Sequence, residues 1–198
     1  MISAPQQANK NWVIFPEKVN GKYAVLHSLT PNVLIEYCND LYFDNNAFID
    51  SCYQSSGREN EWDNWMRGIG PPPIKTNAGW LVLYHSMDKR DPDRYKIGAM
   101  LLDLNDPTKI LYRSSNPLLE PDARYENDGF KSGVVYTCGA VIIGDLLYVY
   151  YGGADTVICA AFIELNQLIS QLKNAQRPTL RKTFTAFKPR RKLRLCIP

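Results

Sequence analysis

Apolar and aromatic residues follow turn-forming glycines in a pattern that occurs three times along the chain. Each repeat begins with a glycine and continues as a run rich in β-branched and aromatic residues; the runs are 21–27, 79–85 and 144–152. Their leading glycines stand 58 and 65 residues apart. A second β-rich segment precedes each run, at 12–19, 73–76 and 138–143. Because short turns of Asn, Gly and Asp between such runs are typical of hairpins, we expect hairpin turns at 20–21, 77–79 and 144–145.

Further short strands accompany these hairpins and are expected at 33–37, 95–102 and 157–163. About four strands in each repeat of about 60 residues is typical of the blade of a β-propeller, so an all-β fold of about three blades is predicted. One C-terminal helix is expected over 164–173, where leucine and isoleucine recur at helical spacing. A propeller needs at least about four blades to close. We therefore expect either a fragment of a longer protein or a ring that another copy or a partner completes.

The charge is distributed unevenly between an acidic body and a basic end. The formal net charge is +3, yet nine bases and no acid stand from residue 173 onward, whereas residues 1–172 carry 14 bases and 20 acids. We assign residues 1–173 to the partial propeller and residues 174–198 to a basic irregular tail. Such a tail can bind nucleic acid or an anionic surface. A solvated terminus is the more common explanation, so nucleic acid is not expected as a partner.

The cysteines and the lengths of the apolar runs indicate in which cellular compartment the protein is expected. The five cysteines are odd in number and include no C-x-x-C pair, so free thiols are expected instead of disulfides or zinc ligands. The first ten residues show no secretory signal pattern. The longest apolar runs, 138–143 and 146–151, are far shorter than the roughly 20 residues of a membrane-spanning helix. We expect a cytoplasmic protein that does not enter a membrane.

Polar residues end equivalent strands of the three repeats. His27 and Ser28 end the first strand, His85 ends the second, and Asp155 lies just beyond the third. Equivalent strand ends of a propeller face a common funnel, which makes these side chains candidates for one site. The alternative for either histidine is a half-buried strand residue without a function.

Other residues offer chemistry suited to anions and sugars. Lys10 and Asn11 supply a cation and an amide that suit an oxyanion or a sugar hydroxyl. The glycine- and proline-rich stretch 68–76 can line a pocket or form a rigid crossover. Tryptophans and tyrosines provide flat faces on which sugar rings stack. Glycosidic chemistry needs an acid and, in hydrolases, a second carboxylate. The candidate carboxylates are Asp63, Asp88, Asp103, Glu126 and Asp155.

Four segments of the chain together resemble glycoside hydrolase family 130. They are N-W-V-I-F-P-E-K-V-N-G-K-Y with a following L-H at 11–27, G-I-G-P-P-P-I-K-T-N-A-G-W-L-V-L-Y-H at 68–85, Y-K-I-G-A-M-L-L-D-L-N-D-P at 95–107 and Y-V-Y-Y-G-G-A-D-T at 148–156. The resemblance covers about residues 9–173. It implies a five-bladed propeller and an inverting enzyme that transfers a mannosyl group from a β-mannoside to phosphate or water.

The resemblance also implies a site. The family's phosphate pocket falls on Lys10, Asn11, His85 and Asp155. A β-mannoside or related oligosaccharide is the implied substrate, with inorganic phosphate as a candidate co-substrate. Neither a metal nor an organic cofactor is implied.

The chain departs from the family pattern at three places. Ser28 and Met66 stand where the family commonly has cations, and Arg67 is the candidate substitute beside Met66. The loss of two cations weakens the case for phosphate, which needs several charge-assisted partners. The family's general acid is an Asp in a Glu-Asp-Pro-Arg-like motif that precedes the segment at 11–27. Because this motif does not occur here, the general acid is expected upstream of Met1.

The missing acid leaves open whether the chain is an enzyme. Loss of a general acid typically costs about 10²- to 10⁴-fold in rate, so the chain alone is expected to be inactive. A non-catalytic carbohydrate-binding or assembly subunit, which keeps the aromatic residues without the acid, is the alternative function.

Overall fold

The computed structural model describes residues 2–43 and 48–183, which are mostly β with two helices. Twelve strands form three antiparallel sheets. The first sheet holds β1 (Val13–Ile14), β2 (Tyr23–Ser28) and β3 (Leu34–Cys38). The middle sheet holds β4 (Trp65–Ile69), β5 (Ile74–Thr76), β6 (Gly79–Asp88), β7 (Asp91–Leu102) and β8 (Ile110–Arg113). The last sheet holds β9 (Val135–Ile143), β10 (Leu146–Gly153), β11 (Val157–Glu164) and β12 (Arg181–Lys182).

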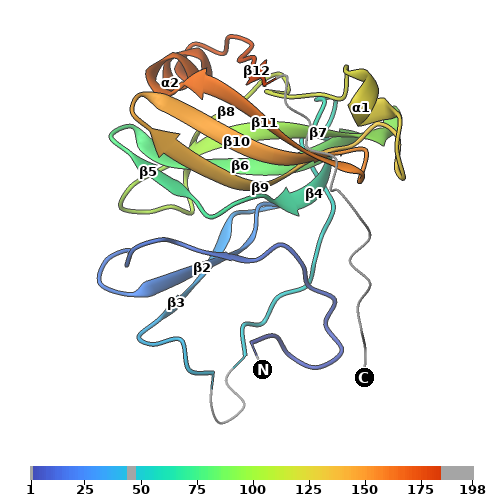
Figure 1. The fold of residues 1–198 in the computed structure, drawn as a ribbon. Helices are drawn as coiled ribbons and strands as arrows, with labels where there is room; N and C mark the ends of the chain where they lie inside the picture. The colour runs from blue at the N-terminus through green and yellow to red at the C-terminus, as the bar shows by residue number, and fades with distance from the viewer. Residues whose placement is uncertain (1, 44–47, 184–198) are drawn as a thin grey trace, which may run out of the picture.

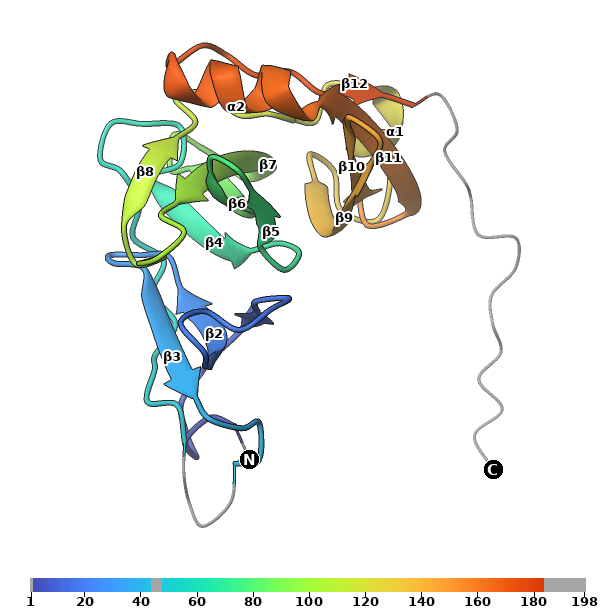
Figure 2. The same cartoon turned by 90° about the vertical axis from the view of Figure 1, so that its left-hand side faces the viewer.

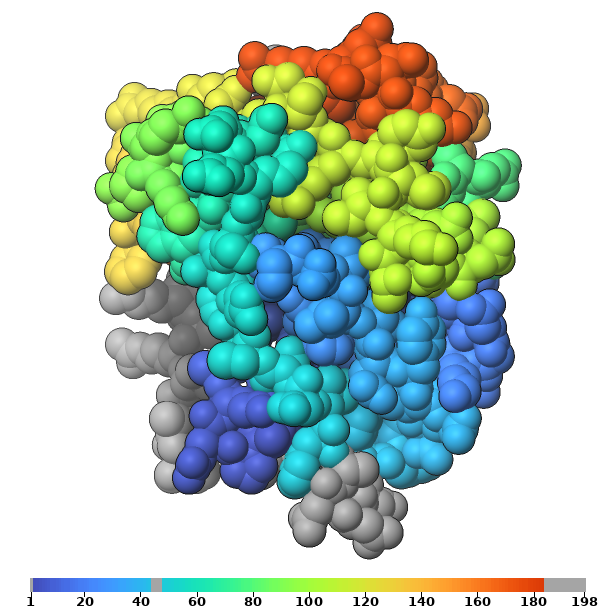
Figure 3. Space-filling view, turned by 180° about the vertical axis from the view of Figure 1, so that it is seen from behind, coloured from blue at the N-terminus to red at the C-terminus, as the bar shows by residue number. Residues whose placement is uncertain are grey.

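The three sheets follow one another in space in the order of the chain and form an arc (Figures 1 and 2). The helix α2 (Leu165–Lys173) lies along one side of this arc, across the middle and last sheets. Figure 3 shows the molecule from behind the view of Figure 1, with the first sheet in blue below the middle sheet and α2 in orange above it. The arc therefore places the middle sheet between two neighbours.

The three predicted hairpin turns are confirmed. The first is a two-residue turn in which Asn20 and Gly21 have φ angles of 50° and 80°, the left-handed conformations that a type I′ turn requires. The second lies between β5 and β6, where Thr76 pairs with Gly79. The third joins β9 to β10 at Gly144, whose φ is 61°. Each turn is set by local residues, which is why the sequence predicts them.

The middle sheet packs against a neighbour on each face. Alternate residues of a strand point to opposite faces, and every residue of β6 is buried. Leu81 and Leu83 belong to the core shared with the last sheet, whereas Trp80, Val82 and Tyr84 belong to the core shared with the first sheet. Two hydrophobic cores, one on each side of the middle sheet, thus hold the three sheets together.

The glycine- and proline-rich stretch 68–76 is part of the middle sheet. Both β4 and β5 pair with β6, so they form one interrupted strand beside it. Residues 71–73 are the three prolines of the interruption, and prolines suit that position because they cannot donate a ladder hydrogen bond. The strands β4 and β8 were not predicted from the sequence.

The C-terminal part of the described chain is packed onto the last sheet. The helix was expected over 164–173, and α2 runs over Leu165–Lys173. The Glu164 carboxylate caps it by accepting from the backbone N–H groups of Asn166 and Gln167. Part of the expected irregular tail is ordered, because β12 pairs with β11 and Leu180 is buried. Residues 184–198 lie outside the described residues.

Two further findings concern helices. A short helix, α1 (Arg124–Asn127), precedes β9 and was not predicted. Among the described residues, no helix is both long enough and apolar enough to cross a membrane.

Candidate functional site

Four of the five predicted site residues are brought together by the sheets. Lys10 and Asn11 lie shortly before β1, Arg67 lies on β4 and His85 lies on β6. Tyr136 of β9 joins them from the last sheet, because its hydroxyl accepts from Asn11 and its ring stacks on His85. The site therefore draws on all three sheets.

The side chain of Asn11 packs directly against the backbone of β4 at Arg67 and Gly68. Its φ of 59° is left-handed, a conformation that asparagine tolerates better than most residues. Its side-chain N–H groups donate to the Tyr136 hydroxyl at 3.1 Å and, over a long 3.4 Å, to the Arg67 carbonyl. A Cβ atom at Gly68 would lie 2.2 Å from Asn11 Nδ2, and Gly68 has a φ of 140°. Only glycine fits there without displacing Asn11.

His85 is a buried, neutral group. Its side chain is fully buried, and Nε2 donates to the Thr137 carbonyl at 2.7 Å because a carbonyl can only accept. Its ring stacks on Tyr136 with centroids 3.8 Å apart. Burial lowers the pKa of His85 to about 4. Nδ1 is buried and makes no hydrogen bond of ordinary geometry within the described residues, although the backbone of Gly68 lies near the ring.

Three cations surround these groups, each over an aromatic ring. Lys10 Nζ lies 4.2 Å from the ring centroid of Tyr53. Arg67 donates from Nε to the Tyr95 hydroxyl at 3.0 Å, and Lys131 Nζ lies 4.8 Å from the centroid of the same ring. Burial, followed by the positive charges of Arg67 and Lys131, lowers the pKa of the Lys10 ammonium. Lys131 was not among the residues predicted from the sequence.

Ser28 and Met66, where the resemblance implied cations, differ in their surroundings. Ser28 is half-buried and lines a small hollow together with Lys10, Asn11 and Met66, and its hydroxyl donates to the Thr30 carbonyl at 2.8 Å. Met66 is only 1% exposed and belongs to the core between the first and middle sheets. A charge at Met66 would therefore be buried among apolar groups.

Asp155 is not joined to the other predicted site residues. It is exposed, has a left-handed φ of 50° and lies in the turn between β10 and β11. Its side chain makes no hydrogen bond or ion pair with any residue in 2–43 or 48–183. Its neighbour Ala154 does contact a residue near the site, because the Ala154 carbonyl accepts from the N–H of Lys131 at 3.0 Å.

Two of the candidate carboxylates, Asp63 and Glu126, are fully buried in structural networks. Asp63 is fully buried and is held by Arg58 at 2.9 Å, by Arg113 at 2.7 Å and by the Tyr84 hydroxyl at 2.7 Å. Burial raises the pKa of Tyr84 to about 12, so its hydroxyl stays a donor to Asp63. A carboxylate held by two arginines and a tyrosine is not available as an acid or a nucleophile.

Glu126 is the second buried carboxylate. It accepts from the Tyr151 hydroxyl at 2.8 Å and from Lys182 Nζ at 2.6 Å. Lys182 lies on β12, so this ion pair ties the ordered end of the described chain to α1. The hydrogen-bonded Tyr151 belongs to the core of the last sheet, which makes the cluster structural.

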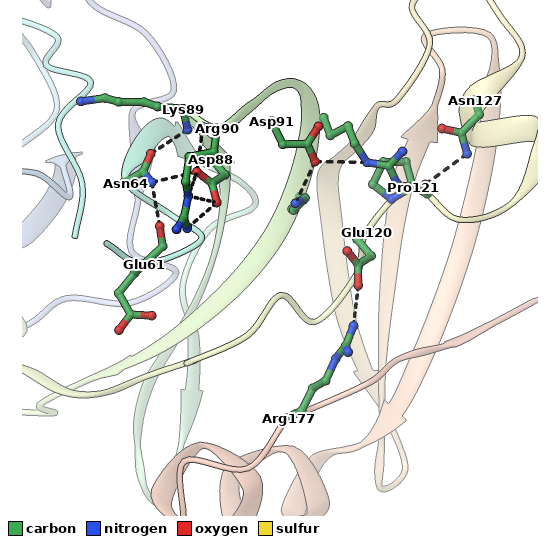
Figure 4. A network of polar contacts seen from close by, with 12 residues as sticks. Glu61, Asn64, Asp88, Lys89, Arg90, Asp91, Glu120, Pro121, Asn127 and Arg177 are labelled. Carbon is green, nitrogen blue, oxygen red and sulfur yellow. Dashed lines mark hydrogen bonds and ion pairs between the residues drawn. The ribbon is translucent and has the colours of Figure 1, made fainter. Parts of the chain in front are cut away.

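The other carboxylates organise turns. At the hairpin between β6 and β7, Asp88 accepts from Asn64 and Arg90 (Figure 4). The hydrogen bonds from the Arg90 guanidinium hold the pKa of Asp88 well below its usual range. Figure 4 also shows Glu120 paired with Arg177. Asp103 accepts from the backbone N–H groups of the two residues at 105 and 106.

Comparison with known proteins places this arrangement in a family. The family model of glycoside hydrolase family 130, described as beta-1,4-mannooligosaccharide phosphorylase, matches residues 2–174. The chain belongs to glycoside hydrolase family 130. Family 130 relatives include a 1,2-beta-oligomannan phosphorylase of Thermoanaerobacter sp. (strain X514), which is 42% identical over 164 residues, or 82% of this chain and 53% of the relative.

The family 130 beta-1,2-mannobiose phosphorylase of Listeria innocua is 43% identical over 176 residues, or 87% of this chain and 48% of the relative. The solved structure of the Listeria innocua protein in complex with beta-1,2-mannobiose matches with a TM-score of 0.72 at 42% identity. That match covers 86% of this chain and 48% of the other. The mostly β architecture is consistent with the five-bladed propeller of family 130. The chain spans about half the length of the curated relatives it matches.

Proposed function

We propose that this chain carries the anion-binding part of a β-mannoside phosphorylase, an enzyme that transfers a mannosyl group from a β-mannoside to inorganic phosphate. The observation that carries the proposal is that Asn11 and His85 both contact Tyr136, and that the charges of Lys10 and Arg67 lie close enough to repel each other. The names of the relatives, a 1,2-beta-oligomannan phosphorylase and a beta-1,2-mannobiose phosphorylase, support the substrate class.

Each group has a role in binding the phosphate nucleophile. Lys10 and Arg67 supply positive charge for the phosphate oxygens, and Asn11 supplies a neutral N–H donor. His85 is neutral because burial lowers its pKa to about 4, and it supports the site by stacking on Tyr136, which in turn accepts from Asn11. These contacts hold the phosphate in one orientation, which lowers the entropic part of the barrier.

The proposed reaction is an inverting displacement. The phosphate oxygen attacks the anomeric carbon from the face opposite the glycosidic bond, while a general acid protonates the leaving oxygen. None of the buried carboxylates described above is assigned as that acid, because Asp63 and Glu126 are held in ion pairs. Water in place of phosphate would give hydrolysis, so the choice of nucleophile depends on the strength of the anion site.

We also propose that the three sheets are three blades of the family propeller, with residues 1–173 as most of its partial ring and 174–198 as a basic segment whose Arg181–Lys182 joins the last sheet as β12. The outer face of the last sheet supports an incomplete ring, because Ile143 and Ile158 are 59% and 63% exposed on it. Completion of the ring by further sequence, a second copy or a partner stays a prediction. A cytoplasmic location also stays a prediction.

Calorimetric titration with inorganic phosphate tests the proposal. The wild-type chain should bind phosphate, and Arg67→Met should weaken the affinity by about tenfold or more, because a charged hydrogen bond contributes about 1.5–3 kcal/mol. Lys89→Met is the matched control, since Lys89 is an exposed lysine on the hairpin between β6 and β7. Equal phosphate affinities for wild type, Arg67→Met and Lys89→Met would overturn the proposed site.

A further inference from the structure

Lys131 approaches the candidate site from the last sheet. It lies in the loop between α1 and β9, and its Nζ is 4.8 Å from the ring centroid of Tyr95. The hydroxyl of the same tyrosine accepts from Arg67 at 3.0 Å. Two cations from different sheets therefore converge on one tyrosine of β7.

Backbone hydrogen bonds hold the loop that carries Lys131 against two neighbouring segments. The N–H of Lys131 donates to the Ala154 carbonyl at 3.0 Å, which ties the loop to the turn between β10 and β11. Two residues later, the Gly133 carbonyl accepts from the N–H of Tyr95 at 2.9 Å, which ties the loop to β7. These backbone bonds fix the point from which the Lys131 side chain reaches toward Tyr95.

The cations at the site lack counter-ions. Within residues 2–43 and 48–183, no ion pair involves Lys10, Arg67 or Lys131. Several other bases of the body are paired, as Arg113 is with Asp63, although Lys18, Lys22 and Lys89 are not paired within the described residues. Three like charges held near one another without an acid are unfavourable unless an anion joins them.

We propose that Lys131 is a phosphate-binding residue, the third cation of the anion site. This inference rests on the proposed function and adds a residue to it. The site then takes Lys10 from beside the first sheet, Arg67 from the middle sheet and Lys131 from the last sheet. Phosphate binding would consequently depend on the packing of all three sheets.

Titration of the purified chain with inorganic phosphate, by calorimetry, tests the inference. Lys131→Met keeps the aliphatic stem over Tyr95 and removes the charge, so the phosphate affinity should fall by about tenfold or more. Lys131→Arg should retain most of the affinity, because it restores the charge. Lys89→Met should bind as the wild type does. Far-ultraviolet circular dichroism and the melting temperature show whether each variant is folded.

The outcomes separate this inference from the proposed function. If Arg67→Met loses affinity while folded Lys131→Met binds phosphate like the wild type, the role of Lys131 is overturned and the proposed site stands. If neither variant loses affinity, or if the wild type does not bind phosphate, both proposals fail. Loss in Lys131→Met with recovery in Lys131→Arg supports the inference.

Discussion

Replacing Gly68 by alanine tests whether the close packing of β4 on Asn11 holds the site together. At a φ of 140°, a side chain is strained by about 1–3 kcal/mol. The added Cβ would also lie 2.2 Å from Asn11 Nδ2, so Asn11 must move and lose its hydrogen bond to Tyr136. That bond is worth about 0.5–1.5 kcal/mol. Because of these two losses, the free energy of unfolding should fall by about 1.5–4.5 kcal/mol.

Urea unfolding followed by tryptophan fluorescence measures this loss. Gly21→Ala is the matched control, because Gly21 has a φ of 80° but no atom within 4 Å of an added Cβ, so only about 1–2 kcal/mol is expected. In an Asn11→Gly background the atoms that clash are gone, and Gly68→Ala should cost only its backbone strain. The reasoning is refuted if Gly68→Ala costs the same in both backgrounds.

Three other substitutions give separate tests. Between pH 6.5 and about 4 the unfolded chain binds a proton on His85 that the folded chain does not, so acidification through this window should remove about 2–3 kcal/mol of stability. Urea unfolding at pH 7 and pH 4.5 should show a smaller loss for His85→Gln than for wild type. Asp63→Asn should reduce the free energy of unfolding by about 3–5 kcal/mol, because Arg58 and Arg113 lose a buried partner. A free energy of unfolding within about 1 kcal/mol of the wild-type value, from urea unfolding, would contradict this. Ser28→Arg should raise phosphate affinity in calorimetry by about tenfold, and an unchanged affinity would place Ser28 outside the anion site.

Local turn chemistry made the hairpins predictable. The Asn20–Gly21 turn depends on two residues that adopt left-handed conformations, and this preference is independent of the rest of the fold. The strand β4 was missed because Trp65–Ile69 contains a glycine and an arginine and lacks regular alternation. Its pairing with β6 is decided by tertiary contacts, which outweigh weak strand propensity.

The site was only partly predictable for the same reason. The resemblance to the family gave Lys10, Asn11 and His85, which the structure brings together, but no sequence signal distinguishes Asp63 from a catalytic carboxylate. Its burial depends on Arg113, which stands 50 residues further along the chain. Lys131 lies in a loop without a motif, and only the convergence of the sheets brings it to Tyr95.

Backbone amide chemical shifts during a phosphate titration test the central claim most directly, because they show where the anion binds. The account predicts saturable shifts that are largest at Asn11, Gly68 and Lys131, and that are lost in Arg67→Met. Largest shifts confined to residues 184–198, or no saturable shift at Asn11 and Gly68, would contradict a phosphate site formed by the three sheets.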